Sequence, residues 1–277
     1  MCSIPPPYSS NEKLVVDKEL GRSLIRSARS SDDLATAYDG WASSYDKTVE
    51  QELSGDGVNY MTTELIEIIR AGVPVESVKG GRILDCGAGT GVAGPLLAAH
   101  FAFDSPQNRS DLGLSALVAF DLSKGMLEQS TARGVYTHCV QGCCPDMEAA
   151  ATAVGGKPFD LCVCAGTVSL FFKATPCRCF RCLHHPSSSL LFNRQTGTFV
   201  PNHAPSSTLP ALVDLTRPGG FVAFTVRSAF FEDDTSGFMR TQTALVHARR
   251  WKLVTDEERR YLPQEGVLAR YFVYEVL

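Results

Sequence analysis

Two aspartates and one glycine-rich segment are the residues of this sequence whose types and spacing best suit chemistry. The segment ILDCGAGTG, at residues 83–91, carries Asp85 ahead of Gly87, Gly89 and Gly91. Glycines permit positive φ angles and lack the Cβ atoms that would keep a ligand away from the backbone. The first N–H groups of a following helix have no partner within that helix. This segment is therefore suited to hold a nucleotide-like ligand on the main chain.

The charge of Asp85 discriminates between two kinds of ligand. The string Gly89-x-Gly91-x-x-Gly94 matches the G-x-G-x-x-G pattern of dinucleotide sites, where a pyrophosphate lies on the loop. That string alone is weak evidence, and a carboxylate repels a pyrophosphate but attracts a ligand that carries sulfonium and ammonium groups. We therefore expect a cationic nucleoside, and NAD is the alternative.

A second carboxylate, Asp121, ends the apolar run SALVAFD at residues 115–121. At the carboxyl end of a neighbouring strand, it can accept two hydrogen bonds from a ribose diol, each on the order of 1.5–3 kcal/mol. Its separation from Gly91 is longer than the roughly 20 residues of a dinucleotide unit. This spacing favours an adenosine-sugar contact outside a dinucleotide site.

Strands and helices alternate around these residues. Apolar runs predict strands at residues 82–86, 115–121, 135–140, 159–164, 219–227, 251–255 and 269–276. Amphipathic segments predict helices at residues 58–71, 91–101, 123–132, 208–217 and 236–250. Parallel neighbouring strands need crossovers that pack on the faces of the sheet. We therefore predict an α/β fold with a doubly wound, mostly parallel seven-stranded sheet and helices on both faces.

The segments outside this alternation set the expected domain boundaries. Residues 1–30 begin as a polar, Pro/Ser-rich stretch and are expected to form a flexible N-terminal tail, whereas residues 31–277 are expected to form one domain. Within it, residues 31–75 predict a helical lid region, because their aromatic residues recur at near-helical spacing. Residues 170–202 show no sustained period, which predicts a poorly ordered insertion.

Composition excludes several classes of protein. The 277 residues are 44% hydrophobic and 20% charged, with a formal net charge of −4, so the chain is globular and has no general basic field for nucleic acid. No segment reads as a secretory leader or a membrane span. Ten cysteines in that context favour reduced thiols. We expect a monomeric cytoplasmic or nuclear protein with no nucleic-acid or membrane partner.

Four blocks of the sequence resemble the class I S-adenosylmethionine (SAM) methyltransferases. These blocks are ILDCGAGTG (83–91), AFDLSKGMLEQS (119–130), FDLCVCAGTVS (159–169) and LVDLTRPGGFVAFTVR (212–227). The preceding motif Tyr38-Asp39-x-Trp41-Ala42-x-x-Tyr45-Asp46 is similar to the methyltransferase-like group represented by the Williams–Beuren syndrome region protein 27. The resemblance implies a Rossmann-like methyltransferase fold and methyl transfer from SAM, which leaves S-adenosylhomocysteine (SAH).

The resemblance also implies which residues bind SAM. The glycine-rich loop would line its methionine half, Asp121 would bind the ribose, and Leu122 and Met126 would flank the adenine. The implied set is Tyr38, Trp41, Tyr45, Asp85, Gly87, Ala88, Gly89, Gly91, Asp121, Leu122, Met126, Gly142, Cys143, Cys164 and Ala165. Cys143 stands where the family has an acidic residue for the adenine amino group, which predicts a weaker contact there.

The methyl acceptor is less defined by the sequence. Residues 165–169 read AGTVS rather than the Asn/Asp-Pro-Pro-Tyr pattern of enzymes that methylate base or glutamine nitrogens, which favours a small-molecule or protein acceptor. His203 and Tyr45 are the candidate general bases. Residues 177–185 contain three cysteines and two histidines, but their crowding in one run argues against a metal site. A non-catalytic SAM-binding regulatory module and an NAD-dependent oxidoreductase are the alternative functions.

Overall fold

The computed structural model describes residues 23–25, 27–49, 60–101, 115–165, 204–234 and 237–277. The predicted insertion at residues 170–202 and the candidate base His203 lie outside these residues, as does most of the predicted N-terminal tail. Within the part of the chain that is described, none of the helices combines the length and hydropathy that a membrane span requires.

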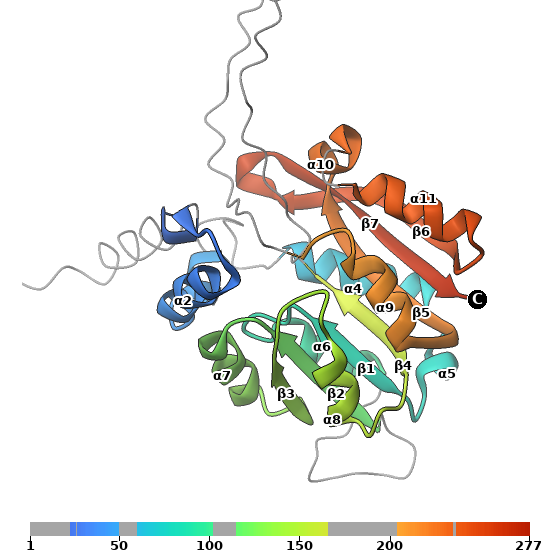
Figure 1. The fold of residues 1–277 in the computed structure, drawn as a ribbon, viewed down its shortest axis with the longest axis horizontal. Coiled ribbons are helices and arrows are strands. Elements are labelled where there is room, and N and C mark those ends of the chain that lie inside the picture. The colour runs from blue at the N-terminus through green and yellow to red at the C-terminus, as the bar shows by residue number, and fades with distance from the viewer. Residues whose placement is uncertain (1–22, 26, 50–59, 102–114, 166–203, 235–236) are drawn as a thin grey trace, which may run out of the picture.

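Seven strands form one sheet in the order β3-β2-β1-β4-β5-β7-β6 (Figure 1). Strands β1 to β5 run parallel, and β7 is antiparallel to both β5 and β6. The bounds are β1 Arg82–Cys86, β2 Ala116–Asp121, β3 His138–Gln141, β4 Phe159–Cys164, β5 Thr216–Arg227, β6 Trp251–Leu262 and β7 Val267–Val276. The predicted doubly wound, mostly parallel seven-stranded sheet is confirmed.

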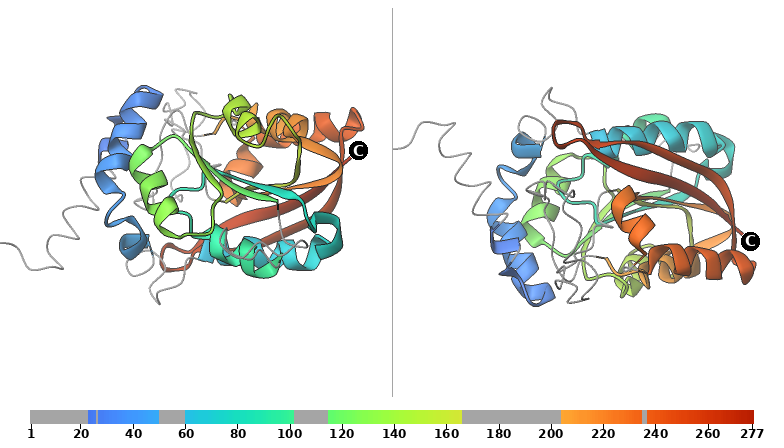
Figure 2. Two further views of the ribbon diagram at one scale, coloured as in Figure 1. Left: turned by 90° about the horizontal axis from the view of Figure 1, so that it is seen from below. Right: turned by 90° about the horizontal axis from the view of Figure 1, so that it is seen from above.

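Helices cover both faces of this sheet, and Figure 2 shows the two helical layers on opposite sides of it. One layer contains α4 (Tyr60–Gly72), α5 (Val75–Val78) and α6 (Ala93–His100), and the other contains α8 (Glu148–Ala153), α9 (Thr208–Leu215) and α11 (Phe238–His247). Each layer buries its own apolar cluster against the sheet. The remaining helices are α2 (Ser31–Trp41), α3 (Tyr45–Lys47), α7 (Lys124–Ala132), α10 (Ser228–Asp233) and the 3-10 turn η2 (Pro263–Glu265).

Local sequence signals account for several helix bounds. Helix α2 begins where the Ser30 side chain accepts a hydrogen bond from the Asp33 N–H, and α7 begins where Ser123 accepts one from the Met126 N–H. Serine is favoured at this position because its hydroxyl satisfies an N–H group that has no partner within the helix. Helix α7 therefore begins within one residue of the start predicted at residue 123.

Several predicted boundaries differ from those of the structure. Strand β6 extends to Leu262 rather than residue 255, and its exposed and half-buried residues alternate. A charged edge strand with one face in water has no apolar run to mark it, which explains the short prediction. The helix predicted to end at residue 217 ends at Leu215, because β5 already begins at Thr216. The short helices α8 and α10 were not predicted.

The order of the strands creates a crevice at one edge of the sheet. The chain runs outward from β1 to β3 and then returns to the other side of β1 with β4. Ligands of open α/β sheets bind at such a switch point, beyond the carboxyl ends of the strands. Asp85 lies near the end of β1, paired with Ala119 of β2 and Val163 of β4. The topology therefore places Asp85 at the switch point.

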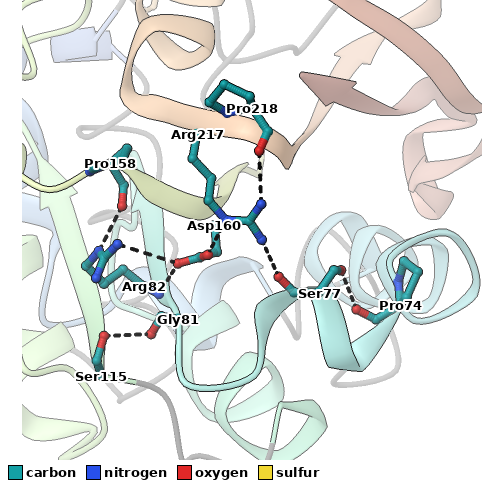
Figure 3. A network of polar contacts seen from close by, with 9 residues as sticks. All are labelled: Pro74, Ser77, Gly81, Arg82, Ser115, Pro158, Asp160, Arg217 and Pro218. Carbon is teal, nitrogen blue, oxygen red and sulfur yellow. Dashed lines mark hydrogen bonds and ion pairs between the residues drawn. The ribbon is translucent and has the colours of Figure 1, made fainter. Parts of the chain in front are cut away.

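The opposite, amino-terminal edge of the sheet is joined by a polar network around Asp160 (Figure 3). The Asp160 carboxylate accepts hydrogen bonds from the Arg82 N–H at 2.7 Å and from Arg217 Nε at 2.5 Å. Arg217 also donates to the Ser77 carbonyl at 2.7 Å. A Cβ at Gly81 would lie 2.5 Å from this carboxylate, so glycine is required there. The network ties α5, β1, β4 and β5 together, away from the crevice.

Helix α2 lies at the margin of the molecule, beside α7 (Figure 1). Its buried residues Leu34, Ala37 and Trp41 pack with Ile25 and Ala28, two residues that fall within the predicted tail. Helix α4, in contrast, packs on the sheet, where its isoleucines are buried in the core. Of the segment predicted as a lid region, α2 therefore packs in a cluster of its own, Tyr45 of α3 contacts both that cluster and the core, and α4 belongs to the core.

Candidate ligand-binding site

The carboxyl ends of the strands enclose a pocket of about 980 Å³, measured with its open mouth. Its walls come from the ends of β1 and β2, the segments after β3 and β4, and helices α2, α3, α4 and α7. Twelve residues predicted from the sequence line it: Tyr38, Tyr45, Asp85, Gly87, Ala88, Gly89, Asp121, Leu122, Met126, Gly142, Cys143 and Ala165. The structure thus brings most of the predicted site residues to one cavity.

The amides of the glycine-rich loop are already bonded to the end of β2. The N–H groups of Gly87 and Ala88 donate to the Phe120 carbonyl at 2.7 and 3.0 Å. The Gly89 N–H donates to Asp121 Oδ2 at 2.8 Å. An anion-binding loop needs amides that point at the ligand without a partner. These three amides are instead used by the protein, and a carboxylate occupies the place of a bound anion.

Asp121 connects the loop to the start of α7. Its Oδ1 accepts a hydrogen bond from the Ser123 N–H at 2.9 Å, while Oδ2 accepts the one from Gly89. Burial raises the pKa of this carboxyl, the backbone hydrogen bonds oppose that shift, and the charge of Asp39 adds to it. An ionised carboxylate has about four lone-pair sites. Asp121 therefore keeps acceptor capacity for two hydroxyl groups of a ligand.

Asp85 is the most deeply buried acid of the pocket, with 1% of its surface exposed. The hydroxyl of Tyr136 donates a hydrogen bond to its Oδ2 at 2.5 Å. Burial raises the pKa of Asp85 to about 7, the hydrogen bond from Tyr136 opposes the shift, and the charge of Asp121 adds to it. Near neutral pH, a cationic group in the pocket would favour the ionised form of Asp85.

Three aromatic residues of α2 and α3 pack against one another beside the pocket. The Trp41 ring lies 6.5 Å from Tyr38, stacked, and 4.9 Å from Tyr45, edge to face. Both tyrosines line the pocket, whereas Trp41 is 3% exposed, does not line it and supports them from behind. Burial raises the pKa of Tyr45 far above its usual value, so its phenol stays protonated at neutral pH and is poorly suited to act as a base.

The two aspartates of the same motif attach this aromatic segment to the rest of the site. Asp39 accepts hydrogen bonds from Ser123 Oγ at 2.5 Å and from the Gly125 N–H at 2.8 Å, at the start of α7. A Cβ at Gly125 would lie 3.0 Å from the Asp39 Cα, so glycine permits this approach. In the spacing Tyr-Asp…Tyr-Asp, each tyrosine faces the pocket and its neighbouring aspartate anchors the helix.

Asp46 makes the second attachment, to the glycine-rich loop. Its carboxylate accepts hydrogen bonds from the Thr90 hydroxyl and from the Arg133 guanidinium. Arg133 Nε also donates to the Thr90 carbonyl at 3.1 Å. Because Thr90 belongs to the loop and Arg133 ends α7, this cluster couples α3 to the two elements that form the pocket floor. Neither aspartate was predicted as a functional residue.

Three predicted residues do not line the pocket. Trp41 lies behind the tyrosines, as described above. Gly91 faces inward, and a Cβ there would lie 2.8 Å from the Tyr136 ring. Cys164 is fully buried in the apolar cluster that also contains Cys86. Gly91 and Cys164 therefore pack behind the residues that line the pocket, and a ligand would contact their neighbours instead.

Several lining residues were missed by the sequence analysis. Leu34 of α2, Met61 and Thr62 of α4, and Ala204 come to the pocket from segments far from the loop. Met61 and Thr62 lie in the first turn of the helix predicted at residues 58–71. That position is the one feature of the sequence that could have placed them near the edge of the sheet. Tyr136, which does not line the pocket but bonds to Asp85, was also missed, because nothing in its local sequence distinguishes it from other residues of the predicted strand at residues 135–140.

Cys143 lines the pocket where the resemblance implies an acidic residue. Burial raises the pKa of its thiol, so Cys143 is neutral at physiological pH. Within the described residues, no three His, Cys, Asp or Glu side chains are arranged to hold a metal ion. The cysteine- and histidine-rich run at residues 177–185 lies outside those residues.

No family model matches the chain, and no curated protein is significantly similar to it in sequence. Solved structures do resemble it. A TehB-like SAM-dependent methyltransferase from Corynebacterium glutamicum is 13% identical, with a TM-score of 0.47 over 87% of this chain and 99% of that one. The N-methyltransferase NodS from Bradyrhizobium japonicum is 14% identical, with a TM-score of 0.44 over 78% and 93%.

TrmN from Thermus thermophilus is 15% identical, with a TM-score of 0.45 over 78% of this chain. This chain spans only about half, 48%, of the length of TrmN. All three likenesses are distant in both sequence and structure.

Proposed function

We propose that this protein is a SAM-dependent methyltransferase that acts on a small-molecule or protein acceptor. The observation that carries this proposal is the pair Asp85 and Asp121, which line one pocket at the ends of adjacent strands. Among the described lining residues there is no lysine, arginine or histidine. Two carboxylates without a basic partner favour a cationic ligand, and SAM carries a sulfonium, an ammonium and a ribose diol.

The lining residues divide by chemistry in a way that suits SAM. In this proposal, Asp85 binds the ammonium group and Asp121 binds the ribose hydroxyls. Leu122 and Met126 provide an apolar wall for the adenine. Gly142 also lines the pocket, and its lack of a side chain makes room for the Phe120 ring. Tyr38 and Tyr45 close the side that faces α2 and α3.

An NAD-dependent oxidoreductase is disfavoured by the hydrogen bonds of the loop. A pyrophosphate needs unpartnered amides at the strand-to-helix turn. The Gly87 and Ala88 amides are bonded to Phe120, and the Gly89 amide is bonded to the Asp121 carboxylate. To bind these amides, a diphosphate would have to replace the Asp121 carboxylate as their acceptor. It would then lie close to the negative charges of both Asp121 and Asp85. The electrostatic cost of this arrangement favours SAM.

The proposed chemistry places modest demands on the protein. When bound, SAM supplies a methyl group on an electrophilic sulfonium, so the chain must align an acceptor in line with it and exclude water. The buried floor at Asp85 and the aromatic wall of Tyr38 and Tyr45 suit both tasks. Tyr38 and Tyr45 are poorly suited to be a general base for a hydroxyl acceptor, because burial keeps both phenols protonated at neutral pH.

We also propose that the chain belongs to the methyltransferase-like group represented by the Williams–Beuren syndrome region protein 27. The support is the motif Tyr38-Asp39-x-Trp41-Ala42-x-x-Tyr45-Asp46. Its tyrosines line the pocket, and its aspartates attach α2 and α3 to the loop and to α7. Every charged and phenolic side chain of the motif thus has a part in building the pocket.

Two measurements test the proposed function. Calorimetric titration of the full chain with SAM, SAH and NAD should show saturable binding of SAM and SAH and none of NAD. Preferential binding of NAD would refute the proposal. Incubation with methyl-labelled SAM and either a metabolite extract or a protein lysate should then show label transfer. Tight SAM binding without transfer to any fraction would instead support the non-catalytic regulatory module.

A further inference from the structure

We propose that Tyr136 is a positioning residue of this site, whose hydroxyl keeps the Asp85 carboxylate oriented and ionised for the ammonium group of SAM. The inference rests on the proposed function. The Tyr136 hydroxyl donates to Asp85 Oδ2 at 2.5 Å. This hydrogen bond favours the ionised form of the carboxyl, against the effect of burial. Tyr136 does not itself line the pocket, so it acts on a ligand through Asp85.

The backbone of the loop is shaped around the Tyr136 ring. A Cβ at Gly91 would lie 2.8 Å from the ring atom Cε2, and a Cβ at Gly94 would lie 2.5 Å from Cζ. Two of the three glycines in the string Gly89-x-Gly91-x-x-Gly94 are therefore needed by a phenol ring rather than by a ligand. Because the ring is held by main-chain contacts, its hydroxyl has a defined position, which preorganises the carboxylate.

Three factors set the pKa of Asp85: its burial, the charge of Asp121 and the hydrogen bond from Tyr136. Burial and the charge of Asp121 favour the neutral acid, and the Tyr136 hydroxyl is the group that favours the carboxylate. Burial and the nearby Asp85 charge hold the pKa of Tyr136 well above its ordinary value. Tyr136 therefore remains a hydrogen-bond donor across the pH range in which Asp85 titrates. Removal of the hydroxyl should shift the Asp85 titration to higher pH.

The test is the substitution Tyr136→Phe, which removes the hydroxyl and keeps the ring that Gly91 and Gly94 surround. Tyr274→Phe is the matched control, because Tyr274 is buried on the other face of the sheet, stacked on Trp251 at 4.0 Å. SAH dissociation constants are measured by calorimetry between pH 6 and 9. In parallel, the Asp85 carboxyl carbon is titrated by NMR in the unliganded proteins.

In the wild type and in Tyr274→Phe, SAH affinity should rise with pH and level off above the Asp85 midpoint. In Tyr136→Phe, that midpoint should move upward by about one pH unit, which weakens SAH binding roughly tenfold at pH 6 and little at pH 9. The NMR midpoint of Asp85 should move in the same direction without ligand. Asp85→Asn should bind SAH weakly and without this pH dependence.

The outcomes separate the inference from the function on which it rests. An unchanged binding midpoint in Tyr136→Phe, in a protein whose wild type binds SAH, would overturn the positioning role and leave the proposed function intact. An equal loss of affinity at every pH would also overturn it, because it would indicate a packing defect. Absence of SAH binding by the wild type would refute the proposed function and the inference with it.

Discussion

Arg133 forms an ion pair with Asp46, and this contact joins the end of α7 to α3 at the rim of the pocket. The Thr90 hydroxyl donates to the same carboxylate, so a single side chain links α3, the glycine-rich loop and α7. The side chains of Arg133 and Asp46 are each 33% exposed, which limits what the ion pair contributes to folding. Its greater effect should be on the position of the Tyr45 wall.

Asp46→Asn tests this effect. We expect the substitution to weaken SAH binding by about 0.5–1.5 kcal/mol, since it removes the negative charge that pairs with Arg133 and weakens the hydrogen bond from Thr90. Global stability should change less, because the pair is partly exposed. Calorimetry and urea denaturation measure the two quantities. Glu128→Gln, an exposed acid on α7, is the control and should change neither. A larger loss in stability than in affinity would contradict this interpretation.

Asp121→Ala should weaken SAM binding by roughly 1.5–3 kcal/mol, because the ribose would lose a charged acceptor. Its partner amides on Gly89 and Ser123 would also lose their acceptor, so the unliganded protein should be less stable as well. The surface variant Asp214→Ala provides the control. An unchanged dissociation constant for SAM would refute the ribose role of Asp121.

Asp85→Asn should stabilise the unliganded protein while it weakens binding. The pKa of Asp85 is about 7 in the folded protein, against an ordinary value of 3.8 that applies to the unfolded chain, so the folded protein binds the proton more tightly. The contribution of Asp85 to stability is therefore full below pH 4 and is lost as pH rises through 7. Asparagine carries no charge and can still accept from Tyr136.

The variant should consequently gain stability over the wild type as pH rises, by up to roughly 4 kcal/mol at pH 8. Urea denaturation of the two unliganded proteins at pH 5 and pH 8 measures this gain. A stability difference that is the same at both pH values would show that Asp85 is ionised without penalty in the folded protein.

Two glycine-to-alanine substitutions should have opposite effects on stability. At Gly94, the new Cβ would lie 2.5 Å from the Tyr136 ring, so we expect a loss of about 1–3 kcal/mol and weaker SAH binding. At Gly40, near the end of α2, a Cβ would meet no atom within 4 Å. Gly40→Ala should therefore stabilise the protein by about 0.5–1 kcal/mol. Thermal denaturation of the two variants is the measurement, and destabilisation by both would be unexpected.

Asp160→Ala should destabilise the protein by roughly 1–3 kcal/mol, because Arg217 Nε and the Arg82 amide lose their shared acceptor. SAH affinity should remain within about twofold in the protein that stays folded, since Asp160 lies at the amino-terminal edge of the sheet. Chemical denaturation and calorimetry test the two parts separately. A large loss of affinity would indicate that the network also supports the pocket.

The sequence alone was sufficient to predict the sheet, the glycine-rich loop and the two aspartates that follow neighbouring strands. Periodicity and strand ends are local properties, and parallel topology brings the carboxyl ends of adjacent strands to the same edge. Asp85 and Asp121 could therefore be placed in one crevice from the alternation of elements. The bounds of β6 could not, because a charged edge strand has little apolar periodicity.

Only the tertiary structure decided what the loop and the aromatic segment are bonded to. The Gly89 amide is bonded to Asp121, and Gly94 makes room for Tyr136, although the same glycine spacing is typical of dinucleotide sites. Asp46 reaches Thr90 and Arg133 across separations of 44 and 87 residues. Such contacts depend on the relative position of packed elements, and no local periodicity encodes that position.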